Sequence, residues 1–212
     1  MRENDRNINL SKGLRVLSPF NGISCGRVAL ERAGIKVERY VSYEIDDDAN
    51  KVAKYNYPDD EYNGDVFEAD FTQYEGFDLL IGGSPCTYWS IAKAGNNGEK
   101  GERETTASGL GWDLFSQYVR ALKEAKPKYF LYENNASMSD EIRECISKEL
   151  GCKPIEIDSA DFSAQHRHRL YWTNIPIEEW TKSELVFDDI IDNDTPYKYR
   201  NFEKYKDTVK VS

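Results

Sequence analysis

The chain has 212 residues, which is enough for one well-buried domain, whereas a second full domain would be crowded. Its composition, with 39% hydrophobic and 13% aromatic residues, is typical of a folded protein and excludes disorder throughout. The formal net charge of -10 argues against a chain that holds a long stretch of nucleic acid alone, because affinity for phosphates comes largely from Lys and Arg. A local basic cleft is still compatible with this charge, since Lys93–Arg103 and Arg167–Arg169 are locally basic.

Targeting, membrane and metal-binding patterns are not found in the sequence. The first residues have no apolar stretch typical of a signal peptide, and no window approaches the ~18 consecutive apolar residues of a membrane span. We therefore expect a cytoplasmic protein without membrane contact. No C-x-x-C pair occurs and only two histidines are present, so we expect no metal site and no disulfide framework. The thiols expected to be reduced are Cys25, Cys86, Cys145 and Cys152.

Apolar runs rich in β-branched residues alternate with stretches of helical spacing along the chain. In chain order we expect a strand at 14–17, a helix at 26–33, a strand at 37–43, a helix at 47–55 and a strand at 78–81. A helix at 112–125, a strand at 129–132, a helix at 139–150 capped by Ser139, and strands at 154–157 and 170–173 follow. This alternation predicts an α/β fold, with a mostly parallel, twisted sheet and helices on both faces.

Two irregular segments accompany this pattern. Residues 87–111 contain five glycines and many charges, and a loop of that length inside a compact domain is usually functional or disordered. After about Ile177 the chain becomes acidic and irregular. We expect a polar N-terminal tail at 1–13, one domain at 14–178 and an irregular acidic tail at 179–212.

A glycine-bearing turn follows the first strand. Gly22 and Gly26 permit a tight turn and a close backbone approach, and the carboxylate of Glu44 suits the hydroxyls of a ribose. The pattern favours an adenosine-containing cofactor, although a corner packed by glycines explains the turn about equally well. Asp65 lies in Asn63-Gly-Asp-Val and suits an adenine amino group, whereas a turn aspartate without a ligand is the commoner case.

A cysteine and a glutamate follow the ends of two strands. The run Leu79-Leu-Ile-Gly-Gly-Ser-Pro-Cys presents Cys86 directly after the rigid Pro85. An exposed thiol at this edge can be a nucleophile, although most single cysteines are inert core residues. Glu133 ends the next predicted strand, so its carboxyl and the thiol are expected to face one crevice, because ligands of open α/β sheets bind at the carboxyl ends of strands. A solvated glutamate is the alternative.

Cations and imidazoles alternate in Gln165-His-Arg-His-Arg, just before the last predicted strand. In an extended chain Arg167 and Arg169 share one side, and His166 and His168 share the other. Two guanidinium groups suit a phosphate and a base carbonyl, and a solvated basic edge or ion pairs with nearby acidic residues are an equal alternative. We interpret the histidines as making local contacts rather than binding a metal.

The motifs stand in a fixed order: Phe20-Asn-Gly-x-x-x-Gly26, Glu44, Gly64-Asp65, Ser84-Pro-Cys86, Glu133-Asn134 and Gln165-x-Arg167-x-Arg169. This set resembles the DNA cytosine-5 methyltransferases, in particular the animal de novo enzymes and their phage or bacterial relatives. The resemblance runs from Leu14 to Pro176. It implies a Rossmann-like fold that binds S-adenosylmethionine and releases S-adenosylhomocysteine, DNA as a partner, and a location with host DNA for a phage-encoded member.

The resemblance also implies a mechanism. The thiolate of Cys86 adds to carbon 6 of a flipped cytosine while Glu133 protonates or hydrogen-bonds ring nitrogen 3. Arg169 holds the cytosine carbonyl, Arg167 supports the loop or backbone, and the glycine-rich loop after Cys86 closes over the base. The residues that the family assigns to cofactor binding are Phe20, Asn21, Gly22, Ile23, Gly26, Glu44, Ile45, Asp65, Val66 and Pro85; those that it assigns to nucleic acid are Ser84, Ser90, Gln165, Arg167 and Arg169.

The sequence ends where family members continue into a target-recognition region, so 179–212 is either a tail or the start of that region. We expect a catalytic fragment or one subunit of a split enzyme, whose second protein chain supplies target recognition; a stand-alone remnant is the other interpretation. A catalytically silent regulatory module that pairs with another methyltransferase chain is the alternative of a different class. RNA cytosine-5 methylation is an alternative too. Methylation of an exocyclic amine is disfavoured, because Ser84-Pro-Cys replaces the Asp/Asn-Pro-Pro-aromatic motif of those enzymes.

Overall fold

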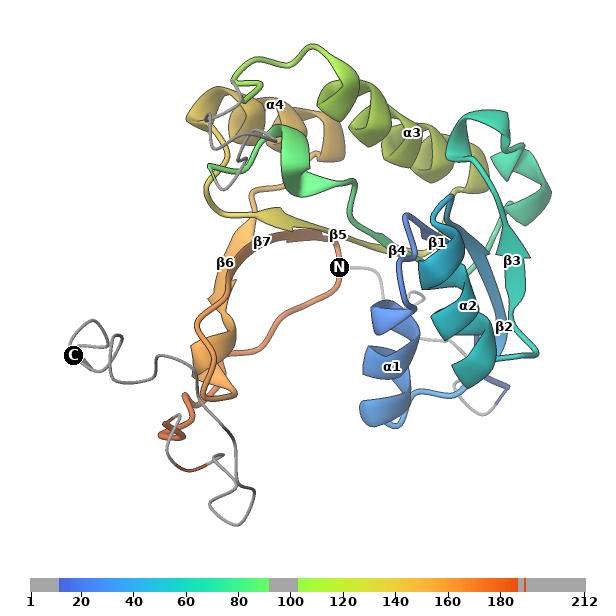
Figure 1. The fold of residues 1–212 in the computed structure, drawn as a ribbon, viewed down its shortest axis with the longest axis horizontal. Coiled ribbons are helices and arrows are strands. Elements are labelled where there is room, and N and C mark those ends of the chain that lie inside the picture. The colour runs from blue at the N-terminus through green and yellow to red at the C-terminus, as the bar shows by residue number, and fades with distance from the viewer. Residues whose placement is uncertain (1–11, 92–102, 187–188, 190–212) are drawn as a thin grey trace, which may run out of the picture.

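The structure, a computed structural model, describes residues 12–91, 103–186 and 189. In this part of the chain one sheet of seven strands forms the centre, in the order β3-β2-β1-β4-β5-β7-β6 (Figure 1). The strands are β1 (Leu14–Pro19), β2 (Val37–Tyr43), β3 (Glu61–Asn63), β4 (Leu79–Gly82), β5 (Tyr129–Asn135), β6 (Ile155–Asp158) and β7 (His168–Thr173). The α-helices are α1 (Cys25–Arg32), α2 (Asp47–Asn56), α3 (Leu110–Ala125) and α4 (Asp140–Leu150). Four short 3-10 helices are η2 (Val66–Glu68), η3 (Phe71–Tyr74), η4 (Cys86–Tyr88) and η5 (Ser159–Asp161).

The strand directions confirm the predicted α/β fold with a mostly parallel sheet. All pairs from β3 to β5 are parallel, and β7 is antiparallel to both β5 and β6. Because β1, β2, β4 and β5 run in one direction, their carboxyl ends lie along one edge of the sheet. The chain segments that follow Pro19, Tyr43, Gly82 and Asn135 therefore meet there.

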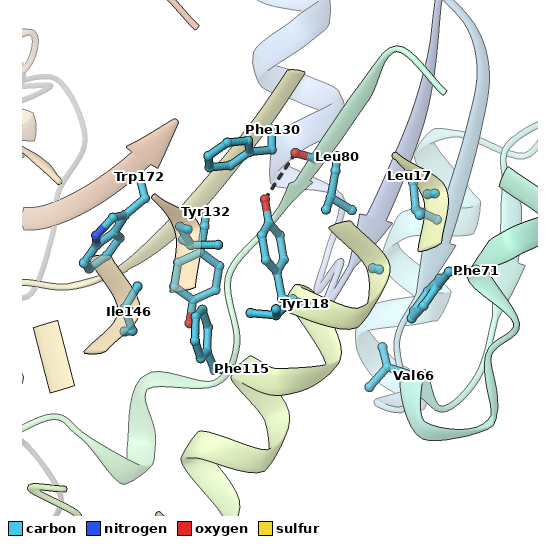
Figure 2. Packing of buried hydrophobic residues seen from close by; sticks show 14 of the residues in the cluster. Leu17, Val66, Phe71, Leu80, Phe115, Tyr118, Phe130, Tyr132, Ile146 and Trp172 are labelled. Atoms are coloured by element: carbon cyan, nitrogen blue, oxygen red, sulfur yellow. Dashed lines mark hydrogen bonds between the residues drawn. The ribbon is translucent and has the colours of Figure 1, made fainter. Parts of the chain in front are cut away.

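The larger core cluster packs one face of the sheet against α3 and α4 (Figure 2). Its centre is aromatic, with the ring of Tyr132 lying 4.8 Å from Tyr118, 5.2 Å from Phe115 and 5.8 Å from Trp172. The hydroxyl of Tyr118 donates to the carbonyl of Leu80 on β4 at 3.4 Å. Tilted aromatic pairs of this kind add to the free energy gained by burial, so α3 is held firmly over β4 and β5.

The opposite face is only partly covered. Leu30 of α1 packs with Val16 and Leu79 in a smaller cluster, and α2 lies beside α1 (Figure 1). Farther along the same face, Leu131 and Tyr171 are half-buried and line an open cavity of about 480 Å³. Helices thus lie on both faces, as predicted, but none of the described helices covers this face over β5 and β7.

Helix boundaries follow local capping chemistry. The carboxylate of Asp46 accepts hydrogen bonds from two backbone N–H groups at the start of α2, and the hydroxyl of Ser139 accepts one from Ile142 in α4. The cap at Ser139 confirms the prediction. Gly151, with a φ of 70°, ends α4 in the left-handed conformation that glycine adopts without a steric penalty.

The structure differs from the predicted elements at a few places. The strand β3 is missing from the apolar runs that predict the strands, because its three residues are polar or aromatic and only their pairing with Val41–Tyr43 makes them a strand. The last strand begins at His168 rather than Leu170, and α3 begins at Leu110 rather than Trp112. Among the predicted tails and loop, residues 1–11, 92–102, 187–188 and 190–212 lie outside the described residues. None of the described helices is long and apolar enough to cross a membrane.

The beginning of the predicted acidic tail is anchored by Asp161. Its carboxylate accepts a hydrogen bond from the indole of Trp180 at 3.0 Å and pairs with Lys182 at 2.8 Å. Its carbonyl accepts from the backbone N–H of Ser183 at 2.8 Å, and the rings of Trp180 and Phe162 are 5.8 Å apart. Residues 179–186 contain no helix or strand, yet they pack on the domain. The predicted boundary at 178 stays a prediction.

Candidate active site

The turn after β1 has an unusual backbone. Phe20, Gly22 and Ser24 have φ angles of 58°, 55° and 67°, all in the left-handed region. Residues other than glycine rarely adopt this region, and backbone strain of this kind is concentrated at functional sites. The buried side chain of Asn21 holds the turn, because its oxygen accepts from Tyr40 at 3.1 Å and its nitrogen donates to Ser24 at 2.7 Å. The turn is therefore fixed in shape.

The carboxylate of Glu44, just past β2, lies against this turn. It accepts a hydrogen bond from the backbone N–H of Gly22 at 2.8 Å, and from the N–H groups of Ile45 and Asp46 at 2.9 Å each. Three donors fix the orientation of the carboxylate without a cation. The structure thus brings Glu44 to the glycine turn.

A cavity of about 480 Å³ lies at the carboxyl ends of β1, β2 and β4. Its walls are largely apolar, with two carboxylates, and six of the ten residues assigned to cofactor binding line it: Phe20, Glu44, Ile45, Asp65, Val66 and Pro85.

The other four residues of that set lie elsewhere. Asn21 and Gly26 line the neighbouring open cavity over β4 and β5, which shares Phe20 with the first cavity. Gly22 lines neither cavity, and its backbone N–H donates to Glu44. Ile23 is 50% exposed and lines neither cavity.

Further apolar walls of the first cavity were not predicted. Phe67 follows Asp65 in η2, while Leu110 and Leu114 come from the first two turns of α3. The two leucines are four residues apart, which places them on the same helix face. That spacing was the available signal, but it does not distinguish a cavity wall from an ordinary core contact.

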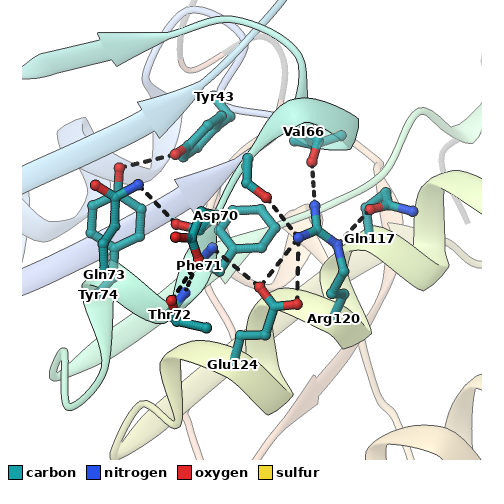
Figure 3. Close-up of polar contacts among 11 residues, drawn as sticks. Tyr43, Val66, Asp70, Phe71, Thr72, Gln73, Tyr74, Gln117, Arg120 and Glu124 are labelled. Atoms are coloured by element: carbon teal, nitrogen blue, oxygen red, sulfur yellow. Dashed lines mark hydrogen bonds and ion pairs between the residues drawn. The ribbon is translucent and has the colours of Figure 1, made fainter.

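Arg120 of α3 fixes the segment that carries Asp65 and Val66 (Figure 3). Its guanidinium donates to the carbonyls of Val66 and Ala69 at 2.6 and 2.7 Å, and its charge lies 4.6 Å from the ring centroid of Phe71. It also pairs with Glu124 at 3.2 Å. Arg120 does not line the cavity, and nothing local in the sequence separates it from the other cations of α3.

Two glycines lead from β4 to the thiol. A Cβ atom on Gly82 would lie 2.4 Å from the carbonyl oxygen of Pro19, and one on Gly83 would lie 2.4 Å from the carbonyl oxygen of Glu133. No side chain fits at these distances, so glycine allows the ends of β1, β4 and β5 to approach closely. Cys86 follows as the first residue of η4, with a free, half-buried thiol.

Cys86 lines a second cavity, of about 570 Å³, together with Arg167 and Arg169. Ser90 and Gln165 line it as well, so four of the five residues assigned to nucleic acid surround the thiol. The guanidinium Nε of Arg169 also lies 2.7 Å from the carboxylate of Glu133. Arg167 lines both this cavity and the adjoining one that contains Glu133.

The ionisation of Glu133 is set by opposing effects. Burial raises the pKa of its carboxyl above the ordinary value, while the charges of Arg169 and Arg167 and the hydrogen bond from Arg169 act in the other direction. Burial dominates, so the protonated form persists to higher pH than in an ordinary glutamate. A carboxyl in that state can donate a proton or a hydrogen bond.

The fifth residue assigned to nucleic acid, Ser84, is 4% exposed. Its hydroxyl lies 2.7 Å from the hydroxyl of Tyr132, and Asn134 donates to that same hydroxyl at 3.0 Å and to the Ser84 carbonyl at 3.2 Å. These bonds tie the end of β4 to the end of β5. The structure does not bring the Ser84 hydroxyl to the second cavity, and a DNA contact by it stays a prediction.

The fold and the site together define a class of protein. An open α/β sheet has an apolar cavity with a fixed carboxylate at its carboxyl edge, which suits a nucleoside-type cofactor. Beside it lie a thiol, a carboxyl with a raised pKa and two guanidinium groups, which are side chains suited to nucleophilic and acid–base chemistry.

The chain belongs to the C-5 cytosine-specific DNA methylase family, whose model matches residues 14–210. It is 40% identical over 123 residues to the orphan methyltransferase M.SPRI of Bacillus phage SPR, an alignment that covers 57% of this chain and 26% of the phage protein. It is 31% identical over 205 residues to the type II methyltransferase M.HgiCII of Herpetosiphon aurantiacus, covering 86% of this chain and 44% of that protein. The chain therefore spans less than half the length of these relatives.

A solved structure from E. coli shares the fold. It is described as a DNA modification methyltransferase encoded within a prophage, and it superposes with a TM-score of 0.56 at 23% identity. The match covers 76% of this chain and 46% of that chain. At this identity the likeness concerns the fold alone.

Proposed function

We propose that this chain is the cofactor-binding and catalytic part of a DNA cytosine-5 methyltransferase. The observation that carries the proposal is the arrangement of Cys86, Arg167 and Arg169 around one cavity, with Glu133 paired to Arg169 at its side. A thiol alone is a weak indication, but the thiol, the carboxyl and the guanidinium together match the needs of a cytosine that is attacked at carbon 6.

The first cavity fits S-adenosylmethionine, which supplies an electrophilic methyl group when bound. The fixed carboxylate of Glu44 suits the two ribose hydroxyls, and Asp65 suits the adenine amino group. Phe20, Val66 and Pro85 give an apolar surface for the adenine ring. The left-handed turn leaves the backbone of Asn21 and Gly22 able to approach the remainder of the ligand.

The residues around the second cavity have separate roles in the proposed reaction. A bond forms between the sulfur of Cys86 and carbon 6, while Glu133 supplies the proton or hydrogen bond at ring nitrogen 3, which makes carbon 5 nucleophilic. Arg169 leaves Glu133 to hold the cytosine carbonyl, and Arg167 supports the backbone. Carbon 5 then gains the methyl group. The proton on carbon 5 leaves to a base, and the bond between the sulfur of Cys86 and carbon 6 breaks.

The target base must leave the duplex to reach Cys86. Arg167, Gln165 and Ser90 line the mouth through which the base enters, and they are suited to contact the flanking phosphates and bases. Because the net charge of the chain is -10, this contact is local. We propose that a further segment or a second protein chain supplies target recognition.

Methyl transfer from tritiated S-adenosylmethionine to duplex DNA tests this proposal. The chain is expected to label DNA, Cys86→Ser to reduce labelling to background, and Cys145→Ser, which alters a free thiol of α4 outside the cavities, to keep it. DNA that contains 5-fluorocytosine is expected to form a covalent complex with the unaltered chain but not with Cys86→Ser, since fluorine replaces the proton that must leave. Labelling by Cys86→Ser would contradict the covalent mechanism.

The same assay separates the alternatives. Binding of S-adenosylmethionine without transfer to DNA or RNA would favour the silent module. Transfer to RNA in place of DNA would favour the RNA branch. Transfer that requires an added methyltransferase chain and still depends on Cys86 would support the split enzyme.

A further inference from the structure

Both histidines of the chain lie beside one aspartate, outside the residues assigned to the reaction. The Nδ1 of His166 and the Nε2 of His168 are each 2.9 Å from the same carboxylate oxygen of Asp158. The three ligand atoms lie within 4.8 Å of one another. They come from the end of β6, from the turn before β7 and from the first residue of β7.

The carboxylate of Asp158 is held from behind. Its second oxygen accepts hydrogen bonds from the backbone N–H groups of Arg167 at 2.7 Å and Ala160 at 3.1 Å. These bonds aim the first oxygen at the two imidazoles. The Asp158 side chain is only 16% exposed, while both histidine rings are open to solvent.

A second carboxylate contacts the far side of one ring. The Oε1 of Glu156 lies 3.4 Å from the Nδ1 of His168, while the Nε2 of that ring points at Asp158. A histidine that binds a metal through one nitrogen commonly donates its other N–H to a carboxylate, which fixes the ring and raises its basicity. Glu156 therefore stands where such a supporting acceptor is needed.

We propose that Asp158, His166 and His168 form a binding site for a divalent transition metal ion, with Zn²⁺ as the best fit. Two imidazoles and a carboxylate suit Zn²⁺, whereas Mg²⁺ and Ca²⁺ prefer oxygen ligands. Ligands about 2.0–2.2 Å from a tetrahedral ion are about 3.3–3.5 Å apart, so the two contacts of 2.9 Å lengthen only slightly on binding. The fourth position is open to solvent.

The site joins the hairpin that carries the proposed DNA-contacting arginines. Arg167 lies between the two histidine ligands in sequence, and Arg169 follows the second. A metal ion would cross-link the end of β6 to both sides of Arg167, which limits the movement of that segment. The sequence pattern alone favoured local contacts, because the third ligand, Asp158, comes from another strand and shows no fixed spacing.

Titration with Zn²⁺ tests the site without cofactor or DNA, so its outcome is independent of the proposed methyl transfer. In a chain prepared without a histidine tag, calorimetry is expected to show one Zn²⁺ ion bound per chain, and Mg²⁺ is expected not to bind. In NMR spectra the imidazole signals of both histidines are expected to shift on addition of Zn²⁺. Because the chain has only two histidines, both signals are assigned to this site, and no variant needs to fold for this measurement.

Variants then locate the ion. His166→Gln, His168→Gln and Asp158→Asn are each expected to lower Zn²⁺ affinity by more than a hundredfold, and Glu156→Gln by about 10–100-fold. Cys25→Ser and Cys86→Ser serve as controls, because thiols are the competing ligands, and both are expected to keep the affinity. Absence of binding, unshifted histidine signals, or an affinity that survives His166→Gln and His168→Gln in folded protein would each overturn the proposal.

Discussion

At the scale of single residues, the acidity of Glu133 depends on burial and on its ion pair with Arg169. Its carboxylate pairs with Arg169 at 2.7 Å, and this pair joins the acid to the cavity that contains the thiol. Burial raises the pKa of Glu133 while the two arginines restrain the rise. Arg169 thus has two roles in the proposed reaction, because it sets the acidity of Glu133 before it holds the base.

Replacement of Arg169 by glutamine is expected to raise the pKa of Glu133 further, because Arg169 is the largest influence that lowers it. The sign follows from the charge: without the cation, the ionised carboxylate loses its partner. A pH titration of the Glu133 carboxyl carbon by NMR measures the shift. Lys182→Gln, which removes an exposed cation paired to Asp161, is the matched control and is expected to leave the titration unchanged. A lower pKa in Arg169→Gln would contradict this account.

Glycine is required at position 83 because a neighbouring backbone oxygen leaves no room for a Cβ atom, and not because of the φ angle. In Gly83→Ala the new Cβ meets the backbone oxygen of Glu133 at 2.4 Å, and backbone cannot move aside as a flexible side chain can. We expect a loss of about 1–3 kcal/mol in the free energy of unfolding, measured with urea. Gly64→Ala has nothing within 4 Å of its Cβ and is expected to change stability by less than about 0.5 kcal/mol. Equal stability of the two variants would show that the strand ends can separate.

At the scale of elements, α3 supports the cofactor cavity from a distance. Arg120 holds the carbonyls of Val66 and Ala69, so a change on the helix affects the position of Asp65. Arg120→Met removes these charged donors and leaves buried carbonyls without partners. The expected result is a loss of about 1–3 kcal/mol in stability, together with weaker binding of S-adenosylmethionine.

The matched control for this prediction is Lys123→Met, which alters an exposed cation on the same helix. This variant is expected to change neither the free energy of unfolding nor the affinity for S-adenosylmethionine appreciably. Calorimetry with S-adenosylmethionine and urea unfolding measure both variants. If Arg120→Met lost stability but bound the cofactor with unchanged affinity, the support would be structural only.

The elements themselves were largely predictable, and the exceptions have physical reasons. Five of the six residues of β1 are buried, so the apolar pattern of this central strand is strong in the sequence, and the confirmed cap at Ser139 is a local signal. By contrast, β3 has three residues and exists because of its partner strand, which no local pattern reveals. The contact of Glu133 with Arg169 was not foreseen either, because it depends on the antiparallel register of β5 and β7.

At the scale of the whole molecule, the negative charge limits how DNA is held. Among the described residues, Arg167 and Arg169 are the arginines that line the cavity of Cys86, and the net charge of the chain is -10, so we expect few phosphates to be neutralised there. The logarithm of DNA affinity is therefore expected to fall with the logarithm of salt concentration with a slope no steeper than about -3. Arg167→Gln is expected to reduce the steepness by about 1. A slope of about -6 or steeper, measured by fluorescence anisotropy, would show a far larger basic surface.

The strand order also has a consequence for folding during synthesis. β1 occupies an interior position, and its pairing of Val16 with Leu79 joins residues far apart in the sequence. A nascent chain that has emerged only through β3 can complete one side of β1, while the other side remains an unpaired edge until β4 appears. The first half of the domain therefore depends on the ribosome delivering the glycine-rich end of β4, and a chain stalled before that point would expose an edge prone to aggregation.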